Sequence, residues 1–486
     1  MLFNSYNFIF IFLPITLLGF HLIGGRSRHR LAIGWLVAMS LVFYSWWNPD
    51  YLGLLVLSIL GNYGFGLALA QQKSRAILVV GIAANLALLG FFKYTNFFLD
   101  NLSGALGTDL QVSPIILPLA ISFFTFQQIA YLVDAYQGHA RERGFLRYCL
   151  FVSFFPQLIA GPIVHHKEML PQFARTSLYR LKSIHLAVGL TIFSIGLFKK
   201  TIIADGLALY ANPVFDAALN GGSISLVEGW GAALAYTFQL YFDFSGYSDM
   251  AVGLARMFGI RLPVNFFSPY KAVSIIDFWR RWHMTLSRFL RDYLYIPIGG
   301  NHRRIASIMV TMLLGGLWHG AGWTFVAWGG LHGAYLIINH AWRKLVPGET
   351  TTPRRWAARV LTFLAVVVGW VLFRAESWEG SMAILSGMAG LNGFALNVAA
   401  PDINWKNVYG ILAGLMIVVW TMPNTYQIMS RYRPTLKDER LPLDPAWKPL
   451  DYKWRPSALS AYITAGVAIA ALSMLTRVSE FLYYQF

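Results

Sequence analysis

The chain contains 486 residues, of which 56% are hydrophobic and only 13% are charged. Soluble domains carry about 25% charged residues, so this composition predicts a polytopic membrane protein. The net charge of +17 would suit a nucleic-acid-binding protein. The basic residues lie in short loops between apolar runs, however, which is typical of membrane topology and argues against nucleic acid. The single cysteine, Cys149, excludes an internal disulfide framework and a cysteine-based metal site.

Apolar runs long enough to cross the bilayer predict an all-α protein with about 11–12 transmembrane helices. The expected spans are Phe8–Ile23, Leu31–Trp47, Tyr51–Ala70, Ala76–Phe92, Pro114–Tyr136, Leu186–Ile202, Val227–Phe242, Ile305–Leu317, Trp323–Trp342, Trp356–Phe373, Val408–Met422 and Ala458–Leu475. Polar residues interrupt the apolar run of the seventh span at Phe242–Asp249. Basic loops on alternate sides place the N-terminus outside the cytoplasm. The first run lacks a basic leader and a cleavage site, so we expect it to be retained.

The segment Phe145–Ile163 is apolar but contains Pro156, Gly161 and Pro162. Basic loops flank it on both sides, so a full crossing would violate the charge bias. We expect a re-entrant segment that enters from the cytoplasm, where protein buries the irregular backbone. A proline kink in an ordinary span is the alternative.

An amphipathic helix is expected over Asp277–Ile296. Its apolar half contains Phe278, Trp279, Trp282, Leu286, Phe289, Leu290, Tyr293 and Leu294, and its polar half contains Asp277, Arg280, Arg281, Arg288, Arg291 and Asp292. This pattern indicates a helix at the membrane interface. His283 falls on the apolar half, where it packs against tryptophans or serves chemistry. The arginine row is interpreted as an anchor to anionic lipid headgroups, with the phosphates of a cytosolic acyl donor as the alternative.

The next stretch places one histidine among glycines at membrane depth. The apolar run Ile305–Leu317 is followed by Trp318 and His319, with Gly315, Gly316, Gly320 and Gly322 around them. Glycine is unfavourable inside helices, so the pattern predicts two short helices hinged at His319. An ionisable residue at this depth indicates a functional site, although a packed histidine is the alternative. His332 is a weaker candidate, and His165–His166 are expected to be solvated loop residues.

The familiar nucleotide, zinc-protease and serine-hydrolase motifs are absent from the sequence. Chemistry would therefore depend on histidines, carboxylates and arginines that membrane helices position. Histidine suits proton transfer near neutral pH, since its unperturbed pKa is about 6.5.

Two segments together resemble the signature of the membrane-bound O-acyltransferase (MBOAT) family. They are FWRRWHMTLSRFLRDYLYIPIGGN and LLGGLWHGAGWTFVAWGGLHG, which carry His283 and His319. The opening MLFNSYNFIFIFLPITLLGF and the stretch FFPQLIAGPIVHH are similar to the bacterial branch that acetylates alginate or transfers D-alanine to teichoic acids. The resemblance extends from Met1 to about His340.

The resemblance implies a ring of tilted helices around a central tunnel, in a single membrane domain over residues 1–486. We expect N-terminal spans in 1–144, a catalytic core in 145–345 and C-terminal spans in 346–486. The match to the family motif places the catalytic histidine at His319 and the second motif histidine at His283. The residues expected to contact substrate are Trp282, Trp318, Arg288, Asp277 and Gln157.

The implied function is O-acyl transfer, most simply acetyl transfer to an alginate-like extracytoplasmic polysaccharide. No permanently bound cofactor or metal is expected, because acetyl-CoA or another acyl thioester would be the donor substrate. Expected partners are an extracytoplasmic SGNH-type acetyltransferase or other acyl acceptor, and the expected location is the bacterial inner membrane. The alternatives are D-alanyl transfer to a cell-wall polymer, a proton-coupled transporter and a structural scaffold. Buried charges are few and no internal repeat is evident, which argues against the transporter.

Overall fold

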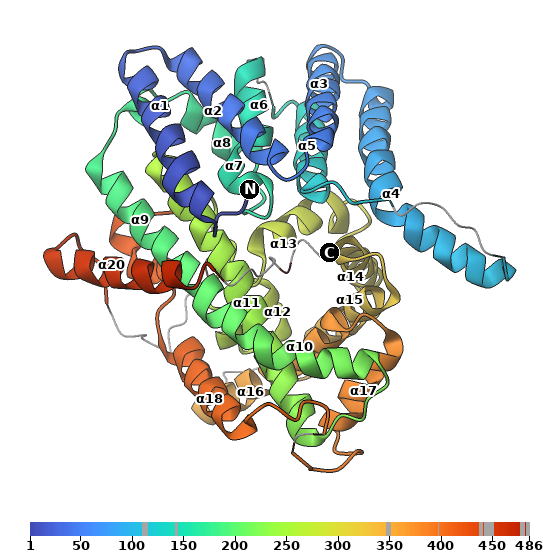
Figure 1. Ribbon diagram of the computed structural model, residues 1–486. Coiled ribbons are helices and arrows are strands. Elements are labelled where there is room, and N and C mark those ends of the chain that lie inside the picture. The colour runs from blue at the N-terminus through green and yellow to red at the C-terminus, as the bar shows by residue number, and fades with distance from the viewer. Residues whose placement is uncertain are drawn as a thin grey trace. The chain divides into compact units, whose positions relative to one another are not determined.

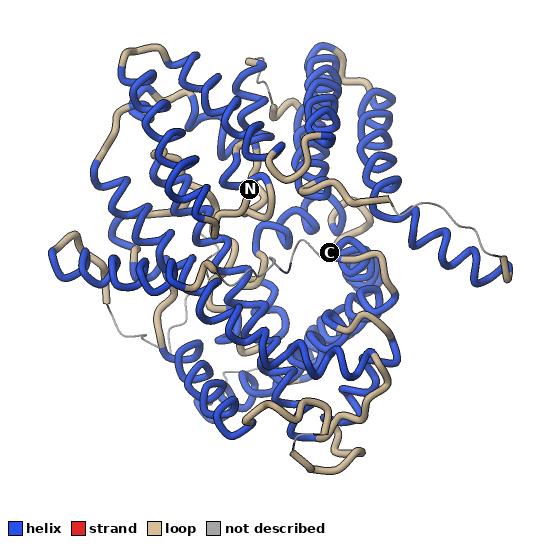
Figure 2. Tube along the Cα trace, viewed as in Figure 1, coloured by secondary structure: helices blue, strands red, loops and turns tan. Residues whose placement is uncertain are grey.

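The computed structural model describes residues 1–108, 115–140, 144–346, 351–396, 398–436, 441, 452–476 and 482. In this part of the chain every regular element is helical (Figures 1 and 2). The helices form two compact units. The first contains Met1–Ile195, Tyr247–Val264 and Tyr432–Lys437, and the second contains Gly196–Gly246, Asn265–Arg431 and Asp438–Phe486. The expected all-α polytopic class is confirmed, while the division at residues 144 and 345 stays a prediction.

The helices of the N-terminal half follow the apolar runs of the sequence. They are η1 (Asn7–Phe12), α1 (Leu13–Gly25), α2 (His29–Ser45), α3 (Asp50–Gln71), α4 (Arg75–Leu106), α5 (Ile121–Tyr136), α6 (Phe145–Ser153), α7 (Phe155–Leu158), α8 (His166–Phe173), η2 (Thr176–Tyr179) and α9 (Ser183–Phe198). The backbone breaks at Phe154, between α6 and α7. This break agrees with the irregular backbone expected near Pro156, whereas entry from the cytoplasm stays a prediction.

The remaining helices build most of the second unit. They are η3 (Lys199–Ala204), α10 (Asp205–Leu219), α11 (Leu226–Met257), η4 (Pro269–Lys271), α12 (Ile275–Trp279), α13 (Met284–Leu290), η5 (Arg291–Tyr295), α14 (Arg304–His319), α15 (Trp323–Leu345), α16 (Thr352–Arg374), α17 (Trp378–Met388), α18 (Trp405–Thr421), α19 (Thr425–Ile428), η6 (Ser430–Tyr432) and α20 (Ala458–Ser473). The expected interruption at Phe242–Asp249 was wrong, because α11 continues through this segment. Its polar side chains are buried against neighbouring helices and do not end the helix.

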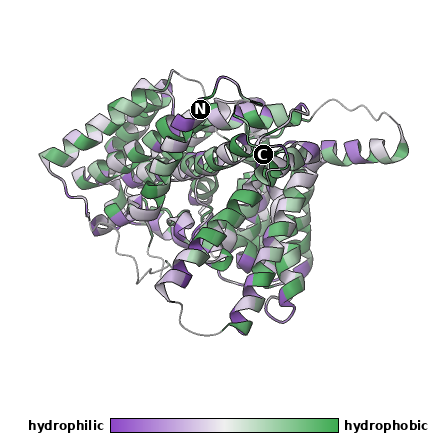
Figure 3. Ribbon diagram, turned by 90° about the horizontal axis from the view of Figure 1, so that it is seen from below, coloured by the Kyte–Doolittle hydropathy of each residue, from purple (hydrophilic) through white to green (hydrophobic). Residues whose placement is uncertain are grey.

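These helices expose an apolar surface that the hydrocarbon of a bilayer can cover. Among the described residues, five helical segments are long and apolar enough to cross a membrane, and four shorter apolar helices accompany them. Hydrophobic residues run along the length of most helices in Figure 3. Within Arg75–Leu106, protein buries only 22% of the 18-residue stretch that has the highest hydropathy. A soluble protein would bury such a surface, so the structure is that of an integral membrane protein.

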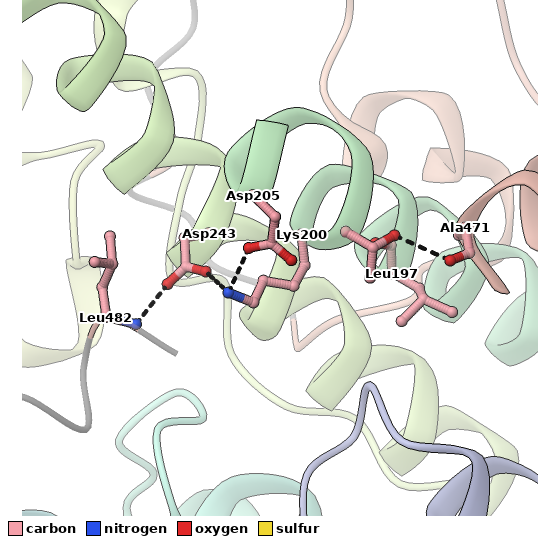
Figure 4. Close-up of polar contacts among 7 residues, drawn as sticks. Leu197, Lys200, Asp205, Asp243, Ala471 and Leu482 are labelled. Atoms are coloured by element: carbon pink, nitrogen blue, oxygen red, sulfur yellow. Dashed lines mark hydrogen bonds and ion pairs between the residues drawn. The ribbon is translucent and has the colours of Figure 1, made fainter. Parts of the chain in front are cut away.

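A buried cluster of charges joins three segments of the second unit (Figure 4). Lys200 Nζ lies 2.8 Å from Asp205 Oδ1 and 2.6 Å from Asp243 Oδ1. Asp243 Oδ2 also accepts a hydrogen bond from the backbone N–H of Leu482 at 3.2 Å. Lys200 lies on the π-helical turn η3. α11 packs closely against this turn at Gly246, where a Cβ would meet the backbone nitrogen of Lys200. One lysine therefore compensates two carboxylates in a site that is almost fully desolvated.

Replacing Lys200 with methionine is expected to destabilise the fold by about 3–5 kcal/mol, because a buried carboxylate loses its counter-charge. The neighbouring Lys199 is the matched control, since its side chain is half-buried and its Nζ donates to the neutral Thr425 Oγ1 at 3.1 Å. Thermal unfolding in detergent should show a much larger loss for Lys200→Met than for Lys199→Met. The double variant Lys200→Met/Asp243→Asn should recover part of the stability that Lys200→Met loses. Equal losses in the two single variants would contradict this account.

Candidate active site

The amphipathic segment is not the single helix that the sequence indicated. It breaks at His283, whose backbone is left-handed with φ 42° and ψ 51°, between α12 and α13. A residue with a Cβ rarely adopts this conformation, which costs free energy unless surrounding structure holds it. The expected continuous helix over Asp277–Ile296 was therefore wrong. The break turns the His283 side chain inward, where it is fully buried.

Asn265 holds this break in place from outside the segment. Its backbone carbonyl accepts a hydrogen bond from Met284 N at 2.9 Å, and its side-chain oxygen accepts one from Thr285 Oγ1 at 2.8 Å. The same oxygen lies 3.1 Å from His283 Nδ1. Since an amide oxygen only accepts, this contact places a proton on Nδ1 and makes Nε2 the acceptor nitrogen of a neutral ring.

Burial lowers the pKa of His283 to about 3, so the folded protein holds the imidazole neutral. The unfolded chain takes up a proton below about pH 6.5, and stability should therefore fall as the pH drops from 6.5 towards 3. Between pH 6.5 and 5 the expected loss from this residue is about 2 kcal/mol. Unfolding in detergent at both pH values should show less acid sensitivity in His283→Gln than in the wild type. The exposed His302→Gln is the control, and equal acid sensitivity in all three proteins would refute the assignment.

His319 is the last residue of α14, immediately before the turn to α15. This position confirms the expected hinge. Only 5% of its surface is exposed, and rings surround the imidazole. The ring centroids of Trp318, Trp328 and Phe373 lie 4.9, 5.2 and 5.2 Å from that of His319. The His283 ring lies 6.4 Å away, so two histidines from separate segments meet in one aromatic environment.

The chain positions His319 by packing α14 tightly against α15. A Cβ at Gly316 would collide with the carbonyl oxygen of Phe325, and one at Gly329 would collide with that of Met312. The two backbones can approach this closely only because both positions are glycine. Close helix packing thus explains Gly316 among the glycines near His319.

A cavity of about 160 Å³ opens beside His319 within the second unit. Its walls come from α12 to α15 and are mainly apolar. The lining residues are Trp279, Leu286, Ser287, Leu290, Arg291, Tyr295, Ile308, Thr311, Met312, Gly315, His319, Trp328 and Leu336. Along α14 they extend from Ile308 to His319, a distance of roughly 16 Å at the helical rise. Along this wall His319 lies at one end of the lining stretch and Ile308 at the other.

The residues expected to contact substrate occupy different places. Trp318 lies against both histidines, whereas Trp282 packs on Trp370 with ring centroids 4.8 Å apart. Asp277 accepts a hydrogen bond from Arg281 Nε at 2.9 Å.

Arg288 does not line the cavity. Gln157 belongs to the first unit, where its Nε2 donates to the carbonyl of Phe151 at 2.6 Å. Substrate contact by these five residues stays a prediction.

Two other histidine predictions have different outcomes. His332 is fully buried between Trp279 and Trp328, and neither ring nitrogen has a hydrogen-bond partner among the described residues. His166 was expected to be solvated, which was wrong. It is buried, with Nδ1 3.3 Å from Asp134 Oδ2 and Nε2 3.4 Å from the carbonyl of His139. The carboxylate and the short helix α8 hold this ring inside the first unit.

The arginines expected on one face of a helix lie in different surroundings in the structure. Arg281 is buried and paired with Asp277, so it cannot reach a lipid headgroup. Arg280 and Arg291 are exposed, and Arg291 pairs with Asp292 at 2.7 Å. The helical wheel assumed an unbroken helix, and the turn at His283 moves Arg281 from the polar face to the interior.

Sequence reasoning missed Asn265, Trp328 and Phe373 as members of the site. Trp328 lies nine residues after His319 in the conspicuous stretch WTFVAWGGLHG, which could have indicated it. Asn265 and Phe373 come from distant segments, and no local pattern marks them.

Over most of its length the chain is similar to known proteins. The family model described as MBOAT, membrane-bound O-acyltransferase family, matches residues 133–376, which include both histidines. The peptidoglycan O-acetyltransferase of Helicobacter pylori is 48% identical over 430 residues, covering 82% of this chain and 81% of that protein. A probable alginate O-acetylase of Azotobacter vinelandii is 39% identical over 452 residues, covering 90% and 87%. The teichoic acid D-alanyltransferase of Bacillus subtilis is 28% identical over 280 residues, covering 54% and 69%.

Proposed function

Because the chain belongs to the membrane-bound O-acyltransferase family, we propose that it transfers acetyl groups with His319 as the catalytic base. The observation that carries this proposal is the position of His319 on the wall of the cavity. Family membership supports an enzyme over the transporter and the scaffold that the sequence left open.

The reaction can be written from the groups present. An acceptor hydroxyl oxygen attacks the carbonyl carbon of an acyl thioester, and its proton passes to His319. The carbon–sulfur bond then breaks, and the thiolate leaves with a proton returned by the imidazolium. The tight aromatic surroundings of His319 exclude water, which limits hydrolysis of the thioester. His283, with its acceptor Nε2, would orient the reacting groups from 6.4 Å away.

The donor would enter the cavity from the end that lies away from His319. A thioester carried on a slender arm suits a mainly apolar cavity whose wall along α14 extends for roughly 16 Å. Acetyl-CoA is the simplest donor of this kind. We further infer a location in the bacterial inner membrane and an extracytoplasmic acceptor, because two relatives are named for peptidoglycan and alginate acetylation. An SGNH-type acetyltransferase would then carry the acetyl group to the polysaccharide.

Transfer of D-alanine is the second candidate, since the teichoic acid D-alanyltransferase of Bacillus subtilis is also similar. An acyl-histidine intermediate at His319 would serve either reaction. Sequence identity is higher, over more of the chain, to the relatives named for acetyl transfer, which favours the acetyl donor.

The test uses membranes that contain the full chain and a co-expressed extracytoplasmic partner. They receive either acetyl-labelled acetyl-CoA or carrier-bound labelled D-alanine, and mass spectrometry identifies the ester formed. Label in an O-acetyl ester is expected. Label found only in a D-alanyl ester would replace the acetyl proposal, and esterification from neither donor would overturn the proposed function.

A further inference from the structure

His332 is a buried imidazole that the reaction proposed for His319 does not use. It lies on α15, one helical turn after Trp328, and its side chain is fully buried. The ring centroids of Trp328, Trp279 and Tyr335 lie 5.0, 5.4 and 5.6 Å from that of the imidazole. Neither Nδ1 nor Nε2 has a hydrogen-bond partner among the described residues. Two unbonded nitrogens in an apolar interior cost free energy, so this histidine needs a physical explanation.

Packing alone does not explain a histidine at this position. A phenylalanine ring would fill a similar volume without removing two polar nitrogens from water. The ring edge lies close to the backbone of α16, because a Cβ at Gly369 would be only 2.7 Å from His332 Nε2. Glycine at this point of α16 therefore leaves the space that the imidazole occupies. The fold accommodates the polar ring, yet the described residues supply no partner for it.

Two hydrogen-bond donors without acceptors lie beside this ring. Nε1 of Trp279 and Nε1 of Trp328 are buried, and neither has a partner among the described residues. A neutral imidazole has one nitrogen that accepts a hydrogen bond, and an indole N–H only donates. Donor and acceptor are thus complementary but unbonded. Because the ring centroids are already 5.4 and 5.0 Å from that of His332, a turn of one indole is enough to bring two nitrogens to the roughly 3 Å of a hydrogen bond.

Trp279 is the indole with room to turn. It is half-buried, it belongs to the five-residue helix α12, and it lines the cavity of about 160 Å³ beside His319. Trp328 is held more firmly, because only 1% of its surface is exposed. Its ring packs on those of Trp370 and Phe373, with centroids 5.8 and 5.1 Å away. Space on one side of Trp279 and an acceptor on the other give this ring two possible positions.

We propose that His332 is a positioning residue, which accepts a hydrogen bond from Trp279 Nε1 when an acyl donor occupies the cavity. The inference rests on the proposed function, because the donor that enters beside His319 displaces the indole from the cavity wall. The new hydrogen bond then holds the wall in the shape that the bound donor requires. Since His332 does not touch the reacting atoms, its contribution belongs to donor binding and appears in KM rather than in kcat.

The experiment measures KM and kcat for labelled acetyl-CoA in membranes with the full chain, and the midpoint of thermal unfolding in detergent. His332→Phe keeps a ring but removes both nitrogens. It should raise KM by about five- to tenfold, the contribution of one hydrogen bond, and change kcat little. The unfolding midpoint should stay the same or rise, because two buried polar atoms without partners are gone. Donor binding and stability are thus expected to change in opposite directions.

The conservative variant His332→Gln reverses this pattern. Its amide oxygen can accept a hydrogen bond from the indole, so KM should stay near that of the wild type. Its unfolding midpoint should fall, because a flexible amide replaces the ring among the aromatic side chains. A residue that serves packing alone would instead lose stability and donor binding together.

Trp279→Phe removes the proposed donor and should raise KM as His332→Phe does. The double variant His332→Phe/Trp279→Phe should be no worse than either single variant, because the same hydrogen bond is lost only once. The matched control is Trp323→Phe, which changes an exposed indole at the start of α15 outside the cavity wall. This control should leave KM unchanged.

Three outcomes would overturn the inference while acetyl transfer by the wild type keeps the proposed function intact. They are a wild-type KM in either single phenylalanine variant, a loss of stability in His332→Phe that parallels its loss of activity, and additive losses in the double variant. If His332→Phe fails to insert, the KM of Trp279→Phe decides between the two accounts. Absence of transfer by the wild type would instead count against the proposed function, and the inference would fail with it.

Discussion

Replacing His319 with alanine is expected to lower acyl transfer by about 10²- to 10⁴-fold, the usual contribution of a general base. The imidazole lies on the cavity wall, and the rings of Trp318, Trp328 and Phe373 fix its position. Alanine has no side-chain group that could accept the proton in place of the imidazole. The initial rate of ester formation in membranes, normalised to the amount of inserted protein, measures the effect.

Two further variants separate chemistry from folding. His319→Gln keeps a polar side chain of similar length but removes the base, so it should be as inactive as His319→Ala. His302→Ala changes an exposed histidine just before α14 and should retain wild-type activity. Normal insertion with full activity in His319→Gln would show that the histidine packs the site and does no chemistry.

The substitution Gly329→Ala is expected to destabilise the protein by about 3 kcal/mol. The added Cβ would collide with the backbone carbonyl of Met312, which no rotamer change can relieve. Because α14 and α15 would have to separate, the position of His319 should change and activity should fall with stability. The midpoint of thermal unfolding in detergent and the rate of acyl transfer measure the two effects.

The adjacent Gly330 is the control for Gly329. A Cβ at Gly330 would meet only Leu313 Cδ2, at an ordinary 3.5 Å. Alanine is favoured over glycine inside a helix by about 1 kcal/mol, so Gly330→Ala should be neutral or stabilising. Destabilisation by both substitutions to the same extent would mean that helix propensity or lipid packing, and not the close backbone contact, determines the effect.

The sequence predicts most helices because bilayer thickness sets the length of an apolar run. The expected Tyr51–Ala70 became α3 (Asp50–Gln71), and Trp356–Phe373 became α16 (Thr352–Arg374). The hinge after His319 was also predictable, since glycines and a lone histidine interrupt an otherwise apolar run. These features depend on local composition, which a sequence shows directly.

Features that depend on distant partners could not be predicted in the same way. The left-handed turn at His283 exists because Asn265, 18 residues earlier, supplies both the carbonyl and the amide oxygen that hold it. Hydropathy likewise treats Lys200 and Asp243 as interruptions of apolar helices, whereas their ion pair allows both to be buried. A helical wheel contains no information about either contact.

The arginine row illustrates the same limit. The sequence indicated a row of arginines on one helix face, including Arg281 and Arg288. The structure instead buries Arg281 beside Asp277 and leaves Arg280 and Arg291 exposed.

The most direct test of His319 as the catalytic base is a single-turnover measurement on purified protein in vesicles. Wild type, His319→Gln and His302→Ala would receive labelled acetyl-CoA and a soluble acceptor partner, and ester formation would be followed with time. We predict a rapid turnover for wild type and His302→Ala and no measurable ester for His319→Gln over the same period. Equal rates in all three proteins would contradict the assignment of the reaction to His319.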